Sequence, residues 1–136
     1  MNSNMLASWA PRALAILRII TGLLFLQHPL MKFFGFPAPM AGSSHLPPLI
    51  QAAGAIEIIG APLIVLGLFT RPVAFVLCGE MAAAYWIAHA PRGFWPILNS
   101  GESAVLFCFV FLYLVFAGPG AWSLDGLRHP ALPKAT

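Results

Sequence analysis

The sequence predicts an all-α integral membrane protein, an antiparallel bundle of four transmembrane helices. Of its 136 residues, 60% are hydrophobic and only 8% are charged, whereas a soluble domain carries about 25% charged residues. The apolar residues form long runs, each close to the roughly 20 residues that cross a bilayer. Prolines and glycines interrupt these runs, as is typical of helix ends. This composition excludes a soluble globular domain and a disordered chain.

The four predicted spans occupy most of the chain. They cover residues 13–34, 46–69, 73–90 and 94–117. Pro11 precedes the first span, and the stretch from Gly35 to Pro48, which holds four prolines, marks the boundary between the first span and the second. The other connections are short, which predicts antiparallel neighbours. We therefore expect an N-terminal segment (1–12), a transmembrane domain (13–117) and a C-terminal tail (118–136).

The distribution of lysine and arginine predicts the orientation. Five of these residues fall on the side of the two termini, namely Arg12, Arg18, Arg71, Arg128 and Lys134. The opposite side holds Lys32 and Arg92. Because cytoplasmic segments carry an excess of Lys and Arg, we expect a multi-pass protein of the cell (inner) membrane with both termini in the cytoplasm. The basic residues are scattered rather than clustered, so the net charge of +3 does not predict nucleic-acid binding.

Each predicted span carries at least one ionisable residue. Arg18 lies in the first span, with Lys32 near its outer end, and Glu57, Glu80 and Glu102 lie in the second, third and fourth. A charge at the bilayer centre costs about 2.5–3.5 kcal/mol on insertion scales. Four helices that each carry this cost predict a shared polar core. We expect Arg18 and Glu57 to form its central pair, with Glu80 nearby in the inner half.

Small residues surround Glu57 at helical spacing. Ala53, Gly54, Gly60 and Ala61 lie three or four residues from it and therefore share its face of the helix. Small residues let membrane helices approach closely. We expect another helix to pack against this strip.

Histidines are expected in the outer half of the core. By depth, His28, His89 and Glu102 gather there with Lys32 and Glu57. His28 and Glu102 could then hydrogen-bond a ligand carbonyl or relay its proton. Imidazole and carboxylate also suit zinc or iron, but no spacing such as H-x-x-x-H supports a metal site. The default expectation is a neutral, hydrogen-bonded ring.

Two interpretations of the charged core stay open. The charges could only hold the helices together, because polar groups contribute about 0.6–2 kcal/mol each to association in membranes. Alternatively, the core binds a polar ligand or passes protons, as intramembrane ionisable residues often do. Three glutamates against one deeply placed arginine favour the second interpretation, because the charges do not balance. Cys78 and Cys108 lie in apolar runs without a C-x-x-C motif, so we expect buried small hydrophobes; thiol chemistry would require them to meet.

The chain resembles the DoxX family of small four-helix membrane proteins over residues 14–125. The resemblance rests on the order and spacing of Leu17-Arg18, Gly22, His28 and Lys32, then Gly54, Glu57, Gly60 and the 67–72 turn, then Ala84, His89, Gly93 and Phe94, and finally Gly101-Glu102, 118–120 and 123–125. One departure is Pro29, which stands where the family usually has glycine. The resemblance implies the four-helix fold and a subunit of a membrane oxidoreductase system, such as a quinol oxidase or thiosulfate–quinone oxidoreductase assembly.

We therefore expect an accessory subunit of a redox complex whose polar pocket accepts a quinone-like headgroup, with Phe25, Trp86 and Phe107 lining its apolar part. No intrinsic cofactor is expected, and the sequence leaves open whether the protein is an enzyme. The expected partners are the lipid bilayer, other redox-complex subunits or further copies of the chain. Two alternatives stay open. One is a small proton-coupled transporter, against which the missing inverted repeat counts. The other is a structural or assembly protein without chemistry of its own.

Overall fold

The protein is built of helices joined by short turns and loops. The structure, a computed structural model, describes residues 3–40 and 45–128, and these ranges contain no β-strand. The helices are α1 (Ser3–Phe34), α2 (Pro48–Leu66), α3 (Thr70–Ala84), α4 (Pro96–Asn99), α5 (Glu102–Ala117) and α6 (Leu124–Arg128). A π-helical turn, η2 (Tyr85–His89), and a 3-10 turn, η3 (Ala90–Arg92), continue α3. The all-α prediction is confirmed.

Three helical segments have the length and apolar composition to cross a membrane, namely Ser3–Phe34, Pro48–Leu66 and Thr70–Arg92. Helix α5 is apolar but has only 16 residues, a rise of about 24 Å against a hydrocarbon core of about 30 Å. Large apolar side chains cover the outside of the helices; Ile59, for example, is 65% exposed. The prediction of a membrane protein with several apolar helices is confirmed, with three helices of spanning length and a shorter fourth.

The predicted fourth span, 94–117, is interrupted. Ser100 adopts a left-handed backbone conformation with φ of 60°, and Asn99 stabilises the break. Its side-chain amide donates to the Gly93 carbonyl at 2.6 Å and its Oδ1 accepts from the Gly101 amide at 2.8 Å. The long helix therefore begins at Glu102. The prediction of one continuous helix was wrong because the asparagine satisfies the backbone groups that a helix would otherwise pair.

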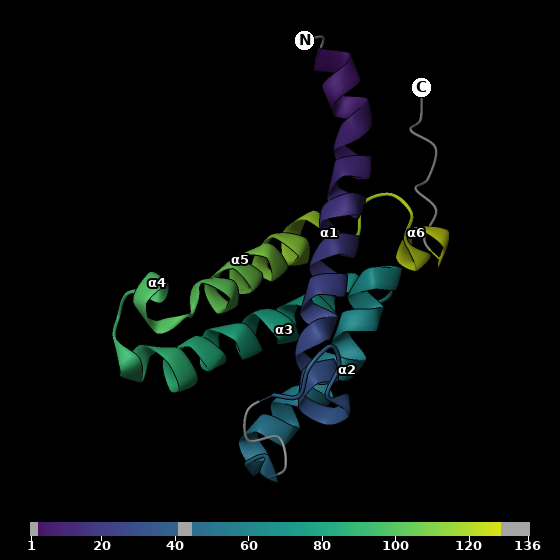
Figure 1. Cartoon of the computed structure of the whole chain (residues 1–136). Helices are drawn as coiled ribbons and strands as arrows, with labels where there is room; N and C mark the ends of the chain where they lie inside the picture. Colours follow the sequence, from purple (N-terminus) through teal and green to yellow (C-terminus); the bar gives the residue numbers. More distant parts are fainter. Residues whose placement is uncertain (1–2, 41–44, 129–136) are drawn as a thin grey trace.

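The first helix is longer than predicted. It begins at Ser3 and continues through Pro11, which the sequence suggested as its boundary. A proline inside a helix removes one hydrogen bond, and membrane helices tolerate this loss. The 32 residues of α1 rise about 48 Å. Its N-terminal end therefore projects beyond the other helices (Figure 1).

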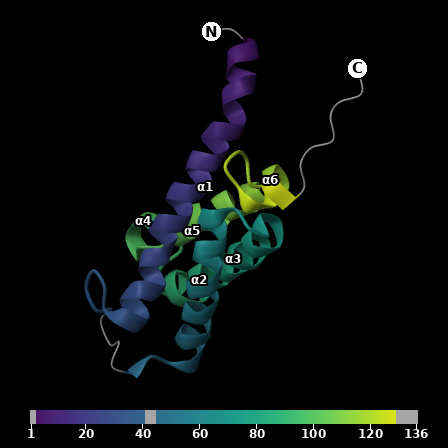
Figure 2. The same ribbon diagram turned by 90° about the vertical axis from the view of Figure 1, so that its right-hand side faces the viewer.

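The long helices form two pairs. Helix α2 returns beside α1, and α5 returns beside α3 (Figure 1). The second pair is inclined to the first, so α3 and α5 are seen almost end-on when the molecule is turned (Figure 2). The two pairs therefore do not share one axis, as the helices of the predicted antiparallel four-helix bundle would.

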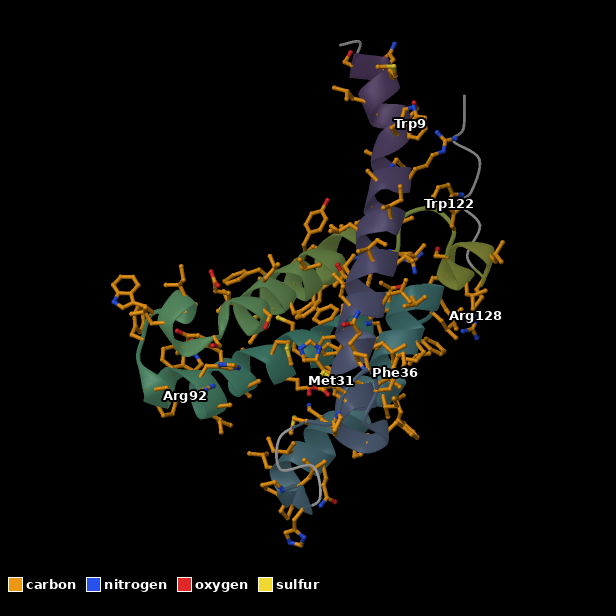
Figure 3. All side chains as sticks on the ribbon, viewed as in Figure 1. Trp9, Met31, Phe36, Arg92, Trp122 and Arg128 are labelled. Atoms are coloured by element: carbon orange, nitrogen blue, oxygen red, sulfur yellow. The ribbon has the colours of Figure 1, made fainter. Side chains whose placement is uncertain are left out.

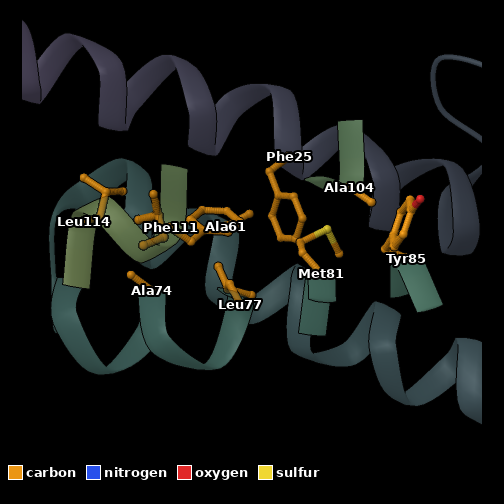
Figure 4. Packing of buried hydrophobic residues seen from close by; sticks show 10 residues of the cluster. Phe25, Ala61, Ala74, Leu77, Met81, Tyr85, Ala104, Phe111 and Leu114 are labelled. Atoms are coloured by element: carbon orange, nitrogen blue, oxygen red, sulfur yellow. The ribbon is translucent and has the colours of Figure 1, made fainter. Parts of the chain in front are cut away.

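Phe25 of α1 joins the two pairs. Its ring is fully buried and meets the rings of Phe107 and Phe111 edge-on at centroid distances of 5.2 and 5.0 Å. The remaining core residues lie on α2, α3, η2 and α5 (Figure 4), namely Ala61, Ile64, Ala74, Leu77, Met81, Tyr85, Ala104, Phe111 and Leu114. The core therefore sits where α1 crosses the α3–α5 pair.

The small-residue strip on α2 has the predicted role. A Cβ atom at Gly54 would lie 2.7 Å from the Phe33 ring and 3.3 Å from the Lys32 side chain. Helices α1 and α2 therefore approach closely here because position 54 lacks a side chain. This contact brings the end of α1 against the face of α2 that carries Glu57.

Candidate functional site

A buried ion pair joins α1 to α2. The Lys32 ammonium donates to both carboxylate oxygens of Glu57, at 2.6 Å each. Glu57 is only 3% exposed. The predicted pair of Arg18 with Glu57 was wrong. Arg18 is 14 residues before Lys32, about 21 Å along the helix, and the approach at Gly54 delivers Lys32 instead.

Glu80 of α3 lies beside this pair. Its carboxyl group interacts electrostatically with Glu57 and Lys32, so it belongs to the same cluster. The sequence predicted an inner group of Glu80 with Arg18 instead. Both Glu80 oxygens are buried, and neither accepts a hydrogen bond of ordinary geometry from the described residues, although the Glu80 carboxyl lies beside that of Glu57. Two carboxyl groups thus face one ammonium, and Lys32 pairs with Glu57. Buried polar groups are nearly always hydrogen-bonded, so Glu80 marks an incomplete site.

The cluster forms one wall of a cavity of about 510 Å³ between α1, α2, α3, η2 and the start of α5. Its polar lining consists of His28, Lys32, Glu57, Glu80, His89 and Ser103. The rest is apolar and includes Ile56, Met81, Ala104 and Phe107. A cavity of this size, apolar with a few converging polar groups, is typical of a small-molecule site. We call it the polar pocket.

Both predicted histidines line the polar pocket. The Nδ1 atom of His28 lies 3.2 Å from the Phe25 carbonyl, and that of His89 lies 3.0 Å from the Asn99 carbonyl. Because a carbonyl only accepts, the Nδ1 atom of His28 carries the proton in this contact, and in the neutral ring its Nε2 is the acceptor. The Nδ1 atom of His89 also faces the donor Nη2 of Arg92 at 3.2 Å, and it can serve only one of its two partners at a time. The His28 ring also packs edge-on against Phe107 at 5.7 Å. No group of three His, Cys, Asp or Glu side chains that could hold a metal occurs among residues 3–40 and 45–128.

Glu102 does not belong to the pocket. It is exposed and is the first residue of α5, where a negative charge is favourable beside the helix N-terminus. The depth estimate was wrong because it assumed a helix that began at residue 94. The aromatic prediction was also correct only in part. Phe107 lines the pocket, Phe25 is buried in the core, and Trp86 is 62% exposed.

Arg18 has a separate and complete set of partners. It is fully buried. Its Nε donates to Pro119 O at 2.8 Å, its Nη1 to the carbonyls of Ile64 and Val65 at 2.6 and 2.5 Å, and its Nη2 to those of Trp122 and Ala121 at 2.8 and 3.4 Å. All five N–H donors of the guanidinium are used. Arg18 thereby ties the end of α2 to the segment after α5.

Sequence reasoning missed two features of this region. Ser103 lines the pocket, and the only signal for it is its spacing of four residues from Phe107, which places both on one face. Cys78 and Cys108, interpreted as small hydrophobes, bring their sulfur atoms within 3.7 Å. His129 and Lys134 of the predicted tail lie outside the described residues.

The fold and the site define a class, namely a helical membrane protein with a pocket between its helices that is apolar and carries a few charged and polar side chains. The family model of DoxX matches residues 13–90, and the chain belongs to this family. The match includes every charged residue and histidine of the polar pocket, and it ends before Glu102.

Relatives cover nearly the whole chain. An uncharacterised protein of Haemophilus influenzae is 46% identical over 127 residues, covering 90% of this chain and 95% of its own. The inner membrane protein YphA of Escherichia coli is 32% identical over 128 residues, covering 85% of this chain and 89% of YphA. CatD of Bacillus subtilis, provisionally named an oxidoreductase, is 30% identical over 113 residues, covering 81% of this chain and 82% of CatD. No solved structure matches the chain.

Proposed function

We propose that the protein is an accessory subunit of a membrane oxidoreductase system and that its polar pocket binds a quinone headgroup. The observation that carries this proposal is Glu80, whose two buried oxygens lack donors at the wall of an otherwise apolar cavity. A ligand that completes this site needs an apolar body and a polar, hydrogen-bonding end. The provisional name of CatD as an oxidoreductase supports the same class of function.

The lining residues fit such a group. The Lys32 ammonium has three N–H donors, and two of them are used by Glu57, so the third can donate to a ligand carbonyl. Glu80 and the Nε2 atom of His28 can accept hydrogen bonds from a ligand hydroxyl. A bound quinone would supply exchange of two electrons and two protons. The carboxylates of Glu57 and Glu80 are the groups of this chain placed to hold or release those protons.

We also propose the inner membrane as the location, with both termini in the cytoplasm. The side that holds Trp122, Arg128 and the projecting end of α1 with Trp9 lies away from Arg92 at the far end of the α3–α5 pair (Figure 3). Arginines are more frequent on the first side, in agreement with the positive-inside rule. The printed name of YphA as an inner membrane protein supports the location.

The decisive experiment measures bound quinone. The full chain is purified from membranes in a mild detergent, its lipids are extracted, and quinone is quantified by mass spectrometry. Glu80→Gln replaces the carboxyl group with an amide and loses a hydrogen bond of about 0.5–1.5 kcal/mol, so the quinone content should fall about twofold to tenfold. The matched control is Glu102→Gln, which changes a carboxylate outside the pocket and should retain the quinone. Both variants should fold like the wild type.

Two results would overturn the proposal. One is a wild-type protein that neither retains quinone nor binds an added short-chain quinone in lipid nanodiscs. The other is an equal loss of quinone in Glu80→Gln and Glu102→Gln. Proton flux by the purified protein in liposomes would favour the transporter alternative instead.

A further inference from the structure

The two cysteines of the chain meet between α3 and α5. Cys78 and Cys108 are its only cysteines, and they lie on different helices 30 residues apart. Their sulfur atoms are 3.7 Å apart, and both thiols are free and partly buried. Neither residue lines the polar pocket, and the proposed function does not use them.

The geometry allows a disulfide. A disulfide has an S–S length of about 2.05 Å, so the sulfurs at 3.7 Å need to approach by about 1.7 Å. Rotation about the Cα–Cβ bonds moves cysteine sulfurs on this scale. The bond would link two helices that already pack against each other.

The pair lies one helical turn from the polar pocket on both helices. Met81, three residues after Cys78, and Ala104, four residues before Cys108, both line the pocket. Residues at these spacings share a face, with about 5–6 Å between their Cβ atoms. The two thiols also pack against the core cluster that contains Met81 and Ala104. The dithiol and the pocket are therefore neighbours across a single layer of side chains.

We propose that Cys78 and Cys108 form a redox-active dithiol that is oxidised by a quinone in the polar pocket. This inference rests on the proposed function. In the reaction two S–H bonds break and one S–S bond forms, and the two protons and two electrons that the thiols lose convert the quinone to a hydroquinone. The disulfide links α3 to α5 beside the wall that carries Glu80. The two thiols would thus act as the electron donor to a quinone bound in the polar pocket.

The test uses the full chain in lipid nanodiscs with reduced thiols. One sample receives a short-chain benzoquinone and a second receives diamide, a thiol oxidant that needs no binding site. Remaining thiols are then alkylated with a maleimide after denaturation, and intact mass spectrometry counts the labels. Cys78→Ala and Cys108→Ala are the controls that cannot form the intramolecular disulfide. Glu80→Gln removes the quinone contact, with Glu102→Gln as its match. Bound quinone is measured in the same samples.

We expect most wild-type and Glu102→Gln chains to lose both label sites with either oxidant, and Glu80→Gln to lose them with diamide only. Reduction with dithiothreitol should restore both labels. If the wild type retains quinone but neither oxidant closes the disulfide, the dithiol is wrong while the proposed function stands. If diamide closes the disulfide and bound quinone does not, the quinone is not the oxidant. If the wild type binds no quinone, both proposals are overturned together.

Discussion

Two cationic side chains of α1, the buried Arg18 and the partly buried Lys32, differ in how completely their surroundings are paired. Arg18 places all five donors on backbone carbonyls. Lys32 bonds to the Glu57 carboxylate, and next to it Glu80 keeps two oxygens without a donor. A buried polar group with all its hydrogen bonds stabilises the fold. A buried polar group without a partner destabilises it, and a ligand that supplies the missing hydrogen bond can offset this cost. Burial of a charge alone therefore does not identify a functional site; incomplete pairing beside a cavity does.

The largest expected effect is on the Arg18 side of this comparison. Arg18→Met leaves the carbonyls at the end of α2 and in the segment after α5 without their donor. We expect a loss of about 3–5 kcal/mol, as for other buried charged groups that lose their partner. Thermal unfolding in detergent, followed by size-exclusion chromatography, measures it. Arg92→Met, at an exposed arginine, is the control and should unfold like the wild type. Equal stability of the two variants would contradict the structural role of Arg18.

Unlike the loss of Arg18, the loss of Lys32 should be rescued by a second substitution. Lys32→Met leaves two buried carboxylates without a cation and should cost about 3 kcal/mol. Lys32→Met combined with Glu57→Met should regain most of that loss, because an apolar pair often replaces a buried ion pair without cost. No second substitution can rescue Arg18→Met in this way, because its partners are backbone carbonyls. If the double variant is as unstable as Lys32→Met in the same unfolding assay, Glu57 is not the main partner of Lys32.

The smallest expected effect concerns Asp125, which supports the Arg18 end from α6. Its carboxylate accepts from the backbone amides of Phe69 and Thr70 at 2.8 Å each. Burial by itself raises the pKa of this carboxyl, but the hydrogen bonds from Thr70 and Phe69 and the charge of Arg128 outweigh it and hold the pKa below its ordinary value. The folded state therefore binds fewer protons at low pH than the unfolded state. The stabilisation is complete above a pH of about 4 and is lost as the pH falls through the lowered pKa.

Unfolding temperatures of the wild type and Asp125→Asn between pH 7 and pH 3 measure this effect. The substitution should cost about 1 kcal/mol at neutral pH, as for other carboxylates that cap a helix. At the acid end the two proteins should converge. Glu102→Gln, at the other carboxylate near a helix N-terminus, should keep the pH dependence of the wild type. A constant difference at all pH values would show that the charge of Asp125 is not what stabilises the start of α3.

Parts of the site followed directly from the sequence. The strip that contains Gly54 predicted close packing around Glu57, because helical spacing fixes which residues share a face. His28, Lys32 and His89 gather with Glu57 around one cavity, as their depths along the predicted helices suggested. Glu102 does not join this cavity. The helix interruption at Asn99 and Ser100 displaces it, and this interruption depends on side-chain hydrogen bonds that hydropathy does not report. Glu80 was misplaced because depth along a straight, upright helix was assumed, whereas α3 is inclined.

The sequence by itself determined that this chain is a helical membrane protein with charges it must bury, since lipid cannot solvate an ionised side chain and since apolar runs of this length have few other uses. The tertiary structure alone decided which charges meet. The close approach at Gly54 and the inclination of the α3–α5 pair set the distances between side chains on different helices. Because of those distances, Glu57 pairs with Lys32, Arg18 bonds to backbone carbonyls, and Glu80 lies beside a cavity.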